Sequence, residues 1–362
     1  MVIKLTGGRA EKVFVDVNGV RQGMFLKSAD ATNPVLLFLH GGPGMPEYFL
    51  DRTHPTGLEH DFTVCWWEQR GAGISYDPGI PRESMTTEQL IRDTVAVTDY
   101  LRERFGRDRI YLLGHSWGSF IGIQVAARAP ERYHAYVGMG QVAHQQKSEV
   151  LAYHYELDQF RKAGRRRMVR RLEAAPVTTD APLPRAYMKV RDKAMHSLGI
   201  GTTRDMRSVI TGVFVPVWLT PGYTLREKAA IWRGKRFSRG VMWDDFLATD
   251  LTARVTALEI PAYFCGGRYD YTVSYDLAKS YLDRLRAPVK GFYTFEHSAH
   301  SPAFEEPAKF RRVLRKDVLA GEAELADWAV VGGRAQTSSF APAPEDGTGT
   351  PPSEASAPGS EP

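Results

Sequence analysis

A serine between two glycines is the feature of this sequence that most directly suggests covalent chemistry. Ser116 lies in the segment 114–118, which reads GHSWG and follows the apolar run 110–113. A helix-like segment comes next, so the serine is predicted to stand at the tip of a strand-to-helix turn. The glycines fit a turn too tight for Cβ atoms at positions 114 and 118. This geometry predicts a nucleophile, and the alternative is a serine that caps a helix.

A serine hydroxyl is a weak nucleophile and needs a base, which in turn needs an acid to orient it. The apolar run 260–265 is predicted as a buried strand and leads into a turn that carries Asp270. A later strand at 290–295 leads into a loop with His297 and His300. His300 comes just before Ser301 and a proline that can open a helix, so it belongs to the loop above the sheet edge. We predict Asp270 as the acid and His300, rather than His297, as the base.

The oxyanion that forms on an attacked carbonyl requires hydrogen-bond donors already in place. The strand-like run 35–39 ends in the segment 40–44, HGGPG, where the backbone can approach a substrate closely. We expect the N–H groups of Gly42 and Trp117 to form the oxyanion hole, with Gly41 as a further donor. The alternative is an ordinary glycine-rich turn or a phosphate cradle, although the dinucleotide pattern G-x-G-x-x-G is absent here.

Five motifs together resemble the proline iminopeptidase group of α/β-hydrolases. They are HGGPG at 40–44, EQRGAGIS at 68–75, GHSWG at 114–118, GRYD at 267–270 and SAHS at 298–301, and the resemblance spans residues 10 to 318. The order serine, aspartate, histidine along the chain also matches this fold.

The resemblance implies an α/β-hydrolase fold, a mostly parallel central sheet with helices on both faces and an inserted helical lid. Ser116, Asp270 and His300 would then be nucleophile, acid and base. The implied activity is that of an aminopeptidase that releases an N-terminal proline or small residue through an acyl-enzyme, with no metal or organic cofactor.

Two departures from the family pattern bear on specificity. Glu68 stands where the family usually has aspartate. In the aminopeptidases a glutamate late in the lid, in a segment like Glu-Asn-His-Tyr-Phe, helps to hold the substrate's amino group. Here the comparable segment 241–246 reads VMWDDF. An esterase, amidase or lactonase therefore stays open as an alternative, and a non-catalytic small-molecule binder on the same fold is a second one.

Strands and helices alternate along most of the chain, which predicts a parallel sheet covered on both faces. An antiparallel pair, 13–17 and 20–27, is expected to precede it, joined by an Asn-Gly turn. The strand rhythm stops after 140 and resumes at 260. We therefore expect a core made of residues 1–140 and 253–320, a helical lid at 141–252 and a disordered tail at 336–362.

The aromatic residues of the expected lid are candidates for contact with substrate. Trp218, Tyr223 and Trp243 are the three we select, since apolar groups that cover a site exclude water and choose a substrate. Internal packing of the lid is the alternative for each of them.

Composition favours a soluble, cytoplasmic protein, and the resemblance implies a small-molecule or short-peptide substrate. Its 362 residues include only two cysteines, Cys65 and Cys265, both in apolar runs that suggest buried thiols rather than a disulfide. No stretch is apolar for long enough to serve as a signal or a membrane span. The net charge is +5. The arginine-rich segment 161–171 is interpreted as a solvated helix face, so no nucleic-acid partner is expected. The sequence does not indicate an oligomeric state.

Overall fold

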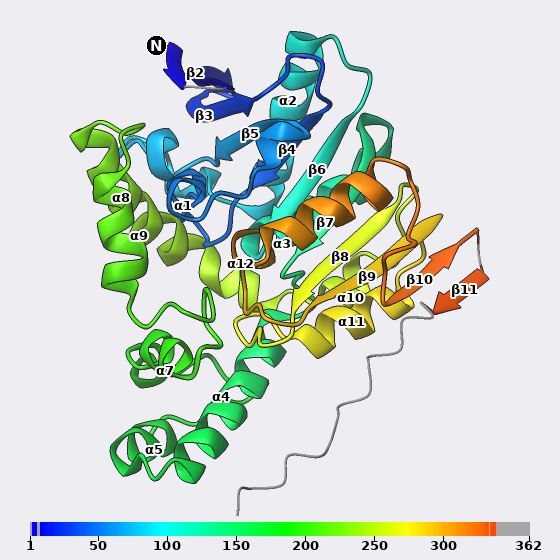
Figure 1. Ribbon diagram of the computed structural model, residues 1–362. Helices are drawn as coiled ribbons and strands as arrows, with labels where there is room; N and C mark the ends of the chain where they lie inside the picture. The colour runs from blue at the N-terminus through cyan, green and yellow to red at the C-terminus, as the bar shows by residue number, and fades with distance from the viewer. Residues whose placement is uncertain (1, 6–7, 333, 338–362) are drawn as a thin grey trace, which may run out of the picture.

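The computed structural model describes residues 2–5, 8–332 and 334–337, and an eleven-stranded sheet runs through it (Figure 1). The strands from β5 to β9 in the sheet run parallel, and antiparallel strands extend both edges. In sheet order they are β1 (Val2–Leu5), β2 (Gly8–Val17), β3 (Val20–Ser28), β5 (Thr63–Glu68), β4 (Val35–Leu39), β6 (Ile110–His115), β7 (Tyr133–Met139), β8 (Ala262–Gly267), β9 (Val289–Phe295), β10 (Trp328–Val331) and β11 (Arg334–Thr337).

The parallel strands are buried on both faces, as their apolar sequences require. In β4, Leu37 and Leu39 belong to the core on one face, while Leu36 and Phe38 belong to the core on the other. The first face is covered by α2 (Thr87–Phe105), α3 (Trp117–Arg128) and α11 (Tyr275–Arg284). The second is covered by α1 (Tyr48–Thr53) and α13 (Pro307–Val313). The predicted fold class, a mostly parallel sheet with helices on both faces, is confirmed.

A run of helices lies between β7 and β8. It contains α4 (Gln145–Lys162), α5 (Arg166–Glu173), α6 (Arg185–Met188), α7 (Arg191–Leu198), α8 (Val215–Leu219) and α9 (Leu225–Ala248), and the short α10 (Leu251–Arg254) follows before β8. The helices α4, α5, α7, α8 and α9 form the green group beside the sheet in Figure 1. Helix α9 begins with a capping box at Thr224 and packs directly on the loop after β5, where a Cβ on Gly234 would lie 2.7 Å from the Gly71 carbonyl oxygen.

The sequence predicted the hairpin near one edge of the sheet correctly but missed the strands at the other edge. The expected hairpin is present, with Asn18 and Gly19 at positive φ between β2 and β3. At the other end, the expected core stopped at residue 320, but β10 and β11 continue the sheet beyond β9. Gln336 and Thr337 pair in β11 and were wrongly assigned to the tail. The remainder of the predicted tail, 338–362, lies outside the described residues.

Both cysteines are buried and free, as expected. Across the described ranges, no helix combines the length and the apolar character that spanning a bilayer would take.

Candidate active site

Ser116 occupies a strained turn between β6 and α3. Its φ of 55° and ψ of −118° are unusual for a residue with a side chain. The flanking glycines permit this turn, because a Cβ on Gly114 would lie 2.4 Å from the Gly118 carbonyl oxygen. A Cβ on Gly118 would lie 1.9 Å from the Leu39 carbonyl oxygen. The turn therefore holds the serine at the carboxyl end of β6, facing a cavity.

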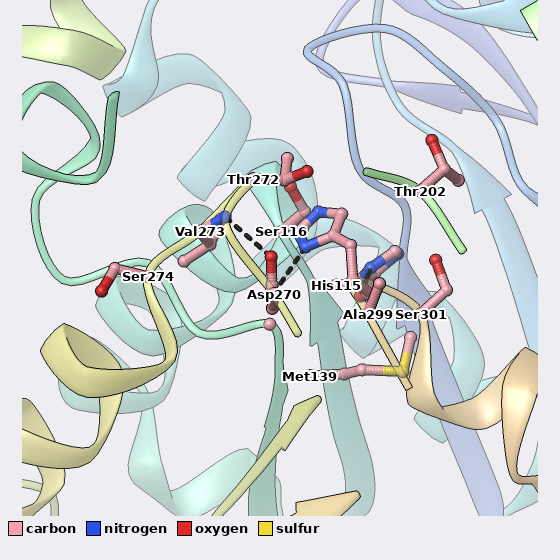
Figure 2. Close-up of polar contacts among 12 residues, drawn as sticks. His115, Ser116, Met139, Thr202, Asp270, Thr272, Val273, Ser274, Ala299 and Ser301 are labelled. Atoms are coloured by element: carbon pink, nitrogen blue, oxygen red, sulfur yellow. Dashed lines mark hydrogen bonds and ion pairs between the residues drawn. The ribbon is translucent and has the colours of Figure 1, made fainter. Parts of the chain in front are cut away.

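Asp270 and His300 meet at the same edge of the sheet. Asp270 follows β8, and His300 lies between β9 and α12 (Pro302–Glu305). The His300 Nδ1 atom lies 2.8 Å from Asp270 Oδ2, and the Val273 N–H donates to Asp270 Oδ1 at 2.9 Å. Figure 2 shows these contacts to Asp270 as dashed lines, with Ser116 labelled in the same view. Because an ionised carboxylate only accepts hydrogen bonds, Nδ1 carries the proton and Nε2 is left as a base. His297, the rejected alternative, is exposed.

The loop that carries His300 is fixed from several sides. The Glu305 carboxylate accepts hydrogen bonds from the Ala299 and Ser301 N–H groups, each at 3.0 Å, and so holds the backbone on both sides of the histidine. The His300 carbonyl oxygen accepts a hydrogen bond from His115 Nε2 at 2.8 Å. Burial raises the pKa of Glu305 to about 7, and it outweighs the backbone N–H donors, which lower the pKa because they favour the ionised carboxylate. Glu305 is thus a positioning residue for this loop.

The predicted oxyanion loop, residues 40–44, follows β4 and lies beside the serine. Within the described residues, the N–H groups of Gly42 and Trp117 have no protein acceptor, so both are available to a substrate oxygen. The expectation for Gly41 is wrong, because its N–H donates to Glu47 Oε1 at 3.0 Å. His40 holds this loop through its ring nitrogens. Its Nε2 accepts a hydrogen bond from the Gln69 N–H, so the ring proton is on Nδ1, which donates to the Gly41 carbonyl oxygen.

A buried pair of charged groups lies under this loop. Glu47 Oε1 also contacts His115 Nδ1 at 2.8 Å. Burial alone would lower the pKa of His115, but the Glu47 carboxylate raises it above its ordinary value. Because His115 Nε2 donates to the His300 carbonyl oxygen, this pair connects the oxyanion loop, the residue before Ser116 and the His300 loop.

Ser116 and His300 line a common cavity of about 180 Å³. Of the three aromatic residues predicted to contact substrate, only Trp243 belongs to the lining of that cavity. Tyr223 is buried elsewhere, where its hydroxyl donates to Glu68 and its ring packs on Phe25. Trp218 is partly exposed at the end of α8. Neither ring lines the cavity, because Tyr223 is used in packing between the inserted helices and the core, and the Trp218 ring meets Phe214 within the inserted segment.

Comparison with known proteins places this chain in a family. Residues 34–307 match the family model described as alpha/beta hydrolase fold. The chain belongs to the α/β-hydrolase fold family. It is 32% identical over 304 residues to the probable aminopeptidase YbaC of Bacillus subtilis, with 83% of this chain and 94% of that protein covered. It is 26% identical over 298 residues to a proline iminopeptidase of Clostridioides difficile, with 79% and 90% covered.

Solved structures agree with this assignment at the level of the fold. A proline iminopeptidase-related protein from Thermus thermophilus superposes with a TM-score of 0.55 at 22% identity, covering 86% of this chain and 98% of that one. The proline iminopeptidase of Mycobacterium smegmatis gives a TM-score of 0.54 at 18% identity, covering 86% of this chain and 100% of that one. By its sequence relatives, this α/β-hydrolase is proline iminopeptidase-like, as the motifs suggested.

Several residues at the site of this α/β-hydrolase were missed by the sequence analysis. Glu47 and Glu305 each bind the backbone of a loop at the site, and the signal for both was a carboxylate within a few residues of a predicted functional loop. Lys235 and Arg239 line the cavity beside Trp243, and their four-residue spacing on α9 was the available signal. None of these residues belongs to a recognised motif, so these signals were too weak to select them.

Proposed function

We propose that this α/β-hydrolase is a serine aminopeptidase in which Ser116 is the nucleophile, His300 the base and Asp270 the orienting acid. The observation that carries the proposal is the contact of His300 Nδ1 with Asp270, which leaves Nε2 as a base in the cavity that Ser116 also lines. The strained turn at Ser116 supports it as well, since such turns expose the serine hydroxyl in serine hydrolases.

The reaction follows from these positions. His300 Nε2 takes the proton of the Ser116 hydroxyl as its oxygen attacks the substrate carbonyl, and the Gly42 and Trp117 N–H groups bind the oxyanion. The imidazolium then gives this proton to the departing amine, and the C–N bond breaks to leave an acyl-enzyme. Water attacks the ester in the second half-reaction with His300 again as the base, which releases the acid and restores Ser116. Neither half requires a cofactor.

The substrate class we propose is a peptide with a free N-terminal proline or small residue. The names of the relatives support this choice, as does the volume of the cavity, which is below the 300–1,000 Å³ of typical ligand pockets. The helices from α4 to α9 would act as the lid over this cavity. We further propose that the enzyme works in the cytoplasm, where its two free cysteines stay reduced.

One observation favours an esterase or amidase that ignores the amino group. In the segment that replaces the glutamate-containing lid motif of the aminopeptidases, Asp244 and Asp245 are exposed, whereas Trp243 and Phe246 line the cavity. An ammonium group would therefore have to be held by Glu47 or Asp192, the two carboxylates in the lining.

Matched substrates separate the two functions. We would assay prolyl and alanyl p-nitroanilides beside their N-acetyl counterparts and p-nitrophenyl acetate. An aminopeptidase is expected to cleave the free-amine substrates at least about tenfold better, since a charge-assisted contact to the ammonium is lost on acetylation. Equal rates for free and acetylated substrates would refute the aminopeptidase proposal and favour the alternative.

A further inference from the structure

Two cations on helix α9 line the cavity with no anion of their own. Lys235 and Arg239 are four residues apart and therefore lie on the same face of the helix. Both are half-buried, and within the described ranges neither forms a hydrogen bond or an ion pair with another protein group. The Arg239 guanidinium lies over the Trp243 ring, 4.6 Å from its centre. That contact is with a ring and not with an anion, and no hydrogen bond from the Arg239 N–H groups is found within the described residues.

The neighbouring carboxylates offset these cations only in part. Glu149 is held by Arg191 through two contacts of 2.7 and 2.6 Å, and Asp192 also contacts Arg191, at 3.1 Å. Three cations thus face two carboxylates, and both carboxylates are already engaged by Arg191. Burial raises the pKa of nearby Glu156 well above its ordinary value, which favours its uncharged form. This side of the cavity keeps a positive charge.

Keeping this pair costs the protein free energy. Like charges four residues apart on a helix repel each other. Burial also works against both charges and lowers the pKa of Lys235 and of Arg239. Their side chains nevertheless line the cavity, as do Trp243 and Asp192. An anionic group on a ligand would offset both costs.

We propose that Lys235 and Arg239 bind the free C-terminal carboxylate of a short peptide, so that the enzyme prefers dipeptides and tripeptides. This inference rests on the proposed aminopeptidase function. A volume of about 180 Å³ suits a substrate of that size. In such a peptide the carboxylate lies only one or two residues beyond the bond that Ser116 attacks, and the apolar wall formed by Met195, Trp243 and Phe246 is available to its side chains.

The test compares prolyl-alanine with prolyl-alaninamide, which share a scissile bond and differ only in the C-terminal charge. We expect kcat/KM for the acid to exceed that for the amide by about tenfold or more, mainly through KM, as for the gain of a charge-assisted contact. Equal values for the two peptides in the wild-type enzyme would overturn the proposal while leaving the aminopeptidase function standing.

Variants assign the effect to the two cations. Lys235→Gln and Arg239→Gln should each reduce the preference for the acid, and the double variant should bring the ratio close to one. Lys235→Arg should retain most of it, because the charge is kept. Arg236→Gln is the matched control, since Arg236 is exposed on the same helix and outside the cavity lining, and it should behave like the wild type. A preference that survives in the double variant would contradict the proposal.

A second readout works even if neither peptide is cleaved. Both peptides are tested as inhibitors of p-nitrophenyl acetate hydrolysis, and the proposal predicts that prolyl-alanine inhibits at about tenfold lower concentration than its amide. That result without peptide cleavage would refute the aminopeptidase function but keep the carboxylate subsite. Equal inhibition constants would refute the subsite.

Discussion

Replacing Asp270 by asparagine isolates the role of a single proton at the site. Asp270 accepts two hydrogen bonds, from Val273 N–H at Oδ1 and from His300 Nδ1 at Oδ2. In Asp270→Asn the amide oxygen can keep the Val273 bond, and the amide NH₂ then faces Nδ1. The opposite orientation would set two donors against each other at Val273, at a cost of about 1–3 kcal/mol.

The favoured orientation therefore forces His300 to accept at Nδ1 and to carry its proton on Nε2. That tautomer cannot take the proton from Ser116, although every hydrogen bond to residue 270 is satisfied. We expect kcat to fall by about 10⁴-fold, which is the loss that the same change causes in a serine protease triad. The free energy of unfolding should change by less than about 1 kcal/mol.

The assay is kcat and KM on the best arylamide or ester, together with urea denaturation of the same preparations. Asp276→Asn serves as the control, because Asp276 is an exposed carboxylate on the neighbouring helix α11. Asp270→Asn with more than about a tenth of the wild-type kcat would refute the reasoning. So would a loss of activity explained by unfolding.

Three further predictions follow from the supporting residues. In Glu305→Ala, the Ala299 and Ser301 N–H groups of the His300 loop both lose their acceptor, so kcat should fall about ten- to a hundredfold while the enzyme stays folded, as judged by circular dichroism; an unchanged kcat would contradict the positioning role. Burial raises the pKa of Glu68 to about 8, so the folded protein holds a proton that the unfolded chain releases, and stability should fall as the pH rises from 5 to 8. Glu68→Gln mimics the protonated form and should reduce that fall by at least about 1 kcal/mol in urea denaturation; an equally steep pH dependence would refute the assignment. In Gly267→Ala, the new Cβ would lie 1.8 Å from the Ala299 carbonyl oxygen, so thermal unfolding should show a free energy of unfolding lower by at least about 1–3 kcal/mol. Gly240→Ala is the control, because a Cβ there has open space around it and should not destabilise the protein. Equal stability of the two variants would count against this packing.

The fold was predictable because its signals are local. The segment 114–118 predicts a strand-to-helix turn through its own glycines, and the structure explains both of them by backbone contacts. The Asn18-Gly19 turn also follows from chemistry within a few residues. Asp270 and His300 were selected by their place at strand ends, and parallel strands bring such ends to one edge. Their catalytic roles stay a prediction.

The errors and omissions concern contacts between distant segments. Gly41 lies in a glycine-rich loop of the kind that supplies oxyanion donors, but its N–H donates a hydrogen bond to the Glu47 carboxylate. Nothing in the glycine-rich motif indicates that the Glu47 side chain folds back onto this loop. Tyr223 has the composition expected of a substrate contact, yet it meets Glu68, which is 155 positions away in the sequence. The strands β10 and β11 are only four residues each, too short to show a clear periodicity. In each case tertiary packing decided the outcome.

Labelling with a fluorophosphonate probe tests the central claim most directly, because such probes react with an activated serine. Peptide mapping by mass spectrometry would locate the adduct, with Ser116→Ala and Ser119→Ala as the paired variants. The account predicts a single adduct on Ser116, formed in the Ser119→Ala control and lost in Ser116→Ala together with turnover. Labelling at another residue, or near-normal turnover in folded Ser116→Ala, would contradict it.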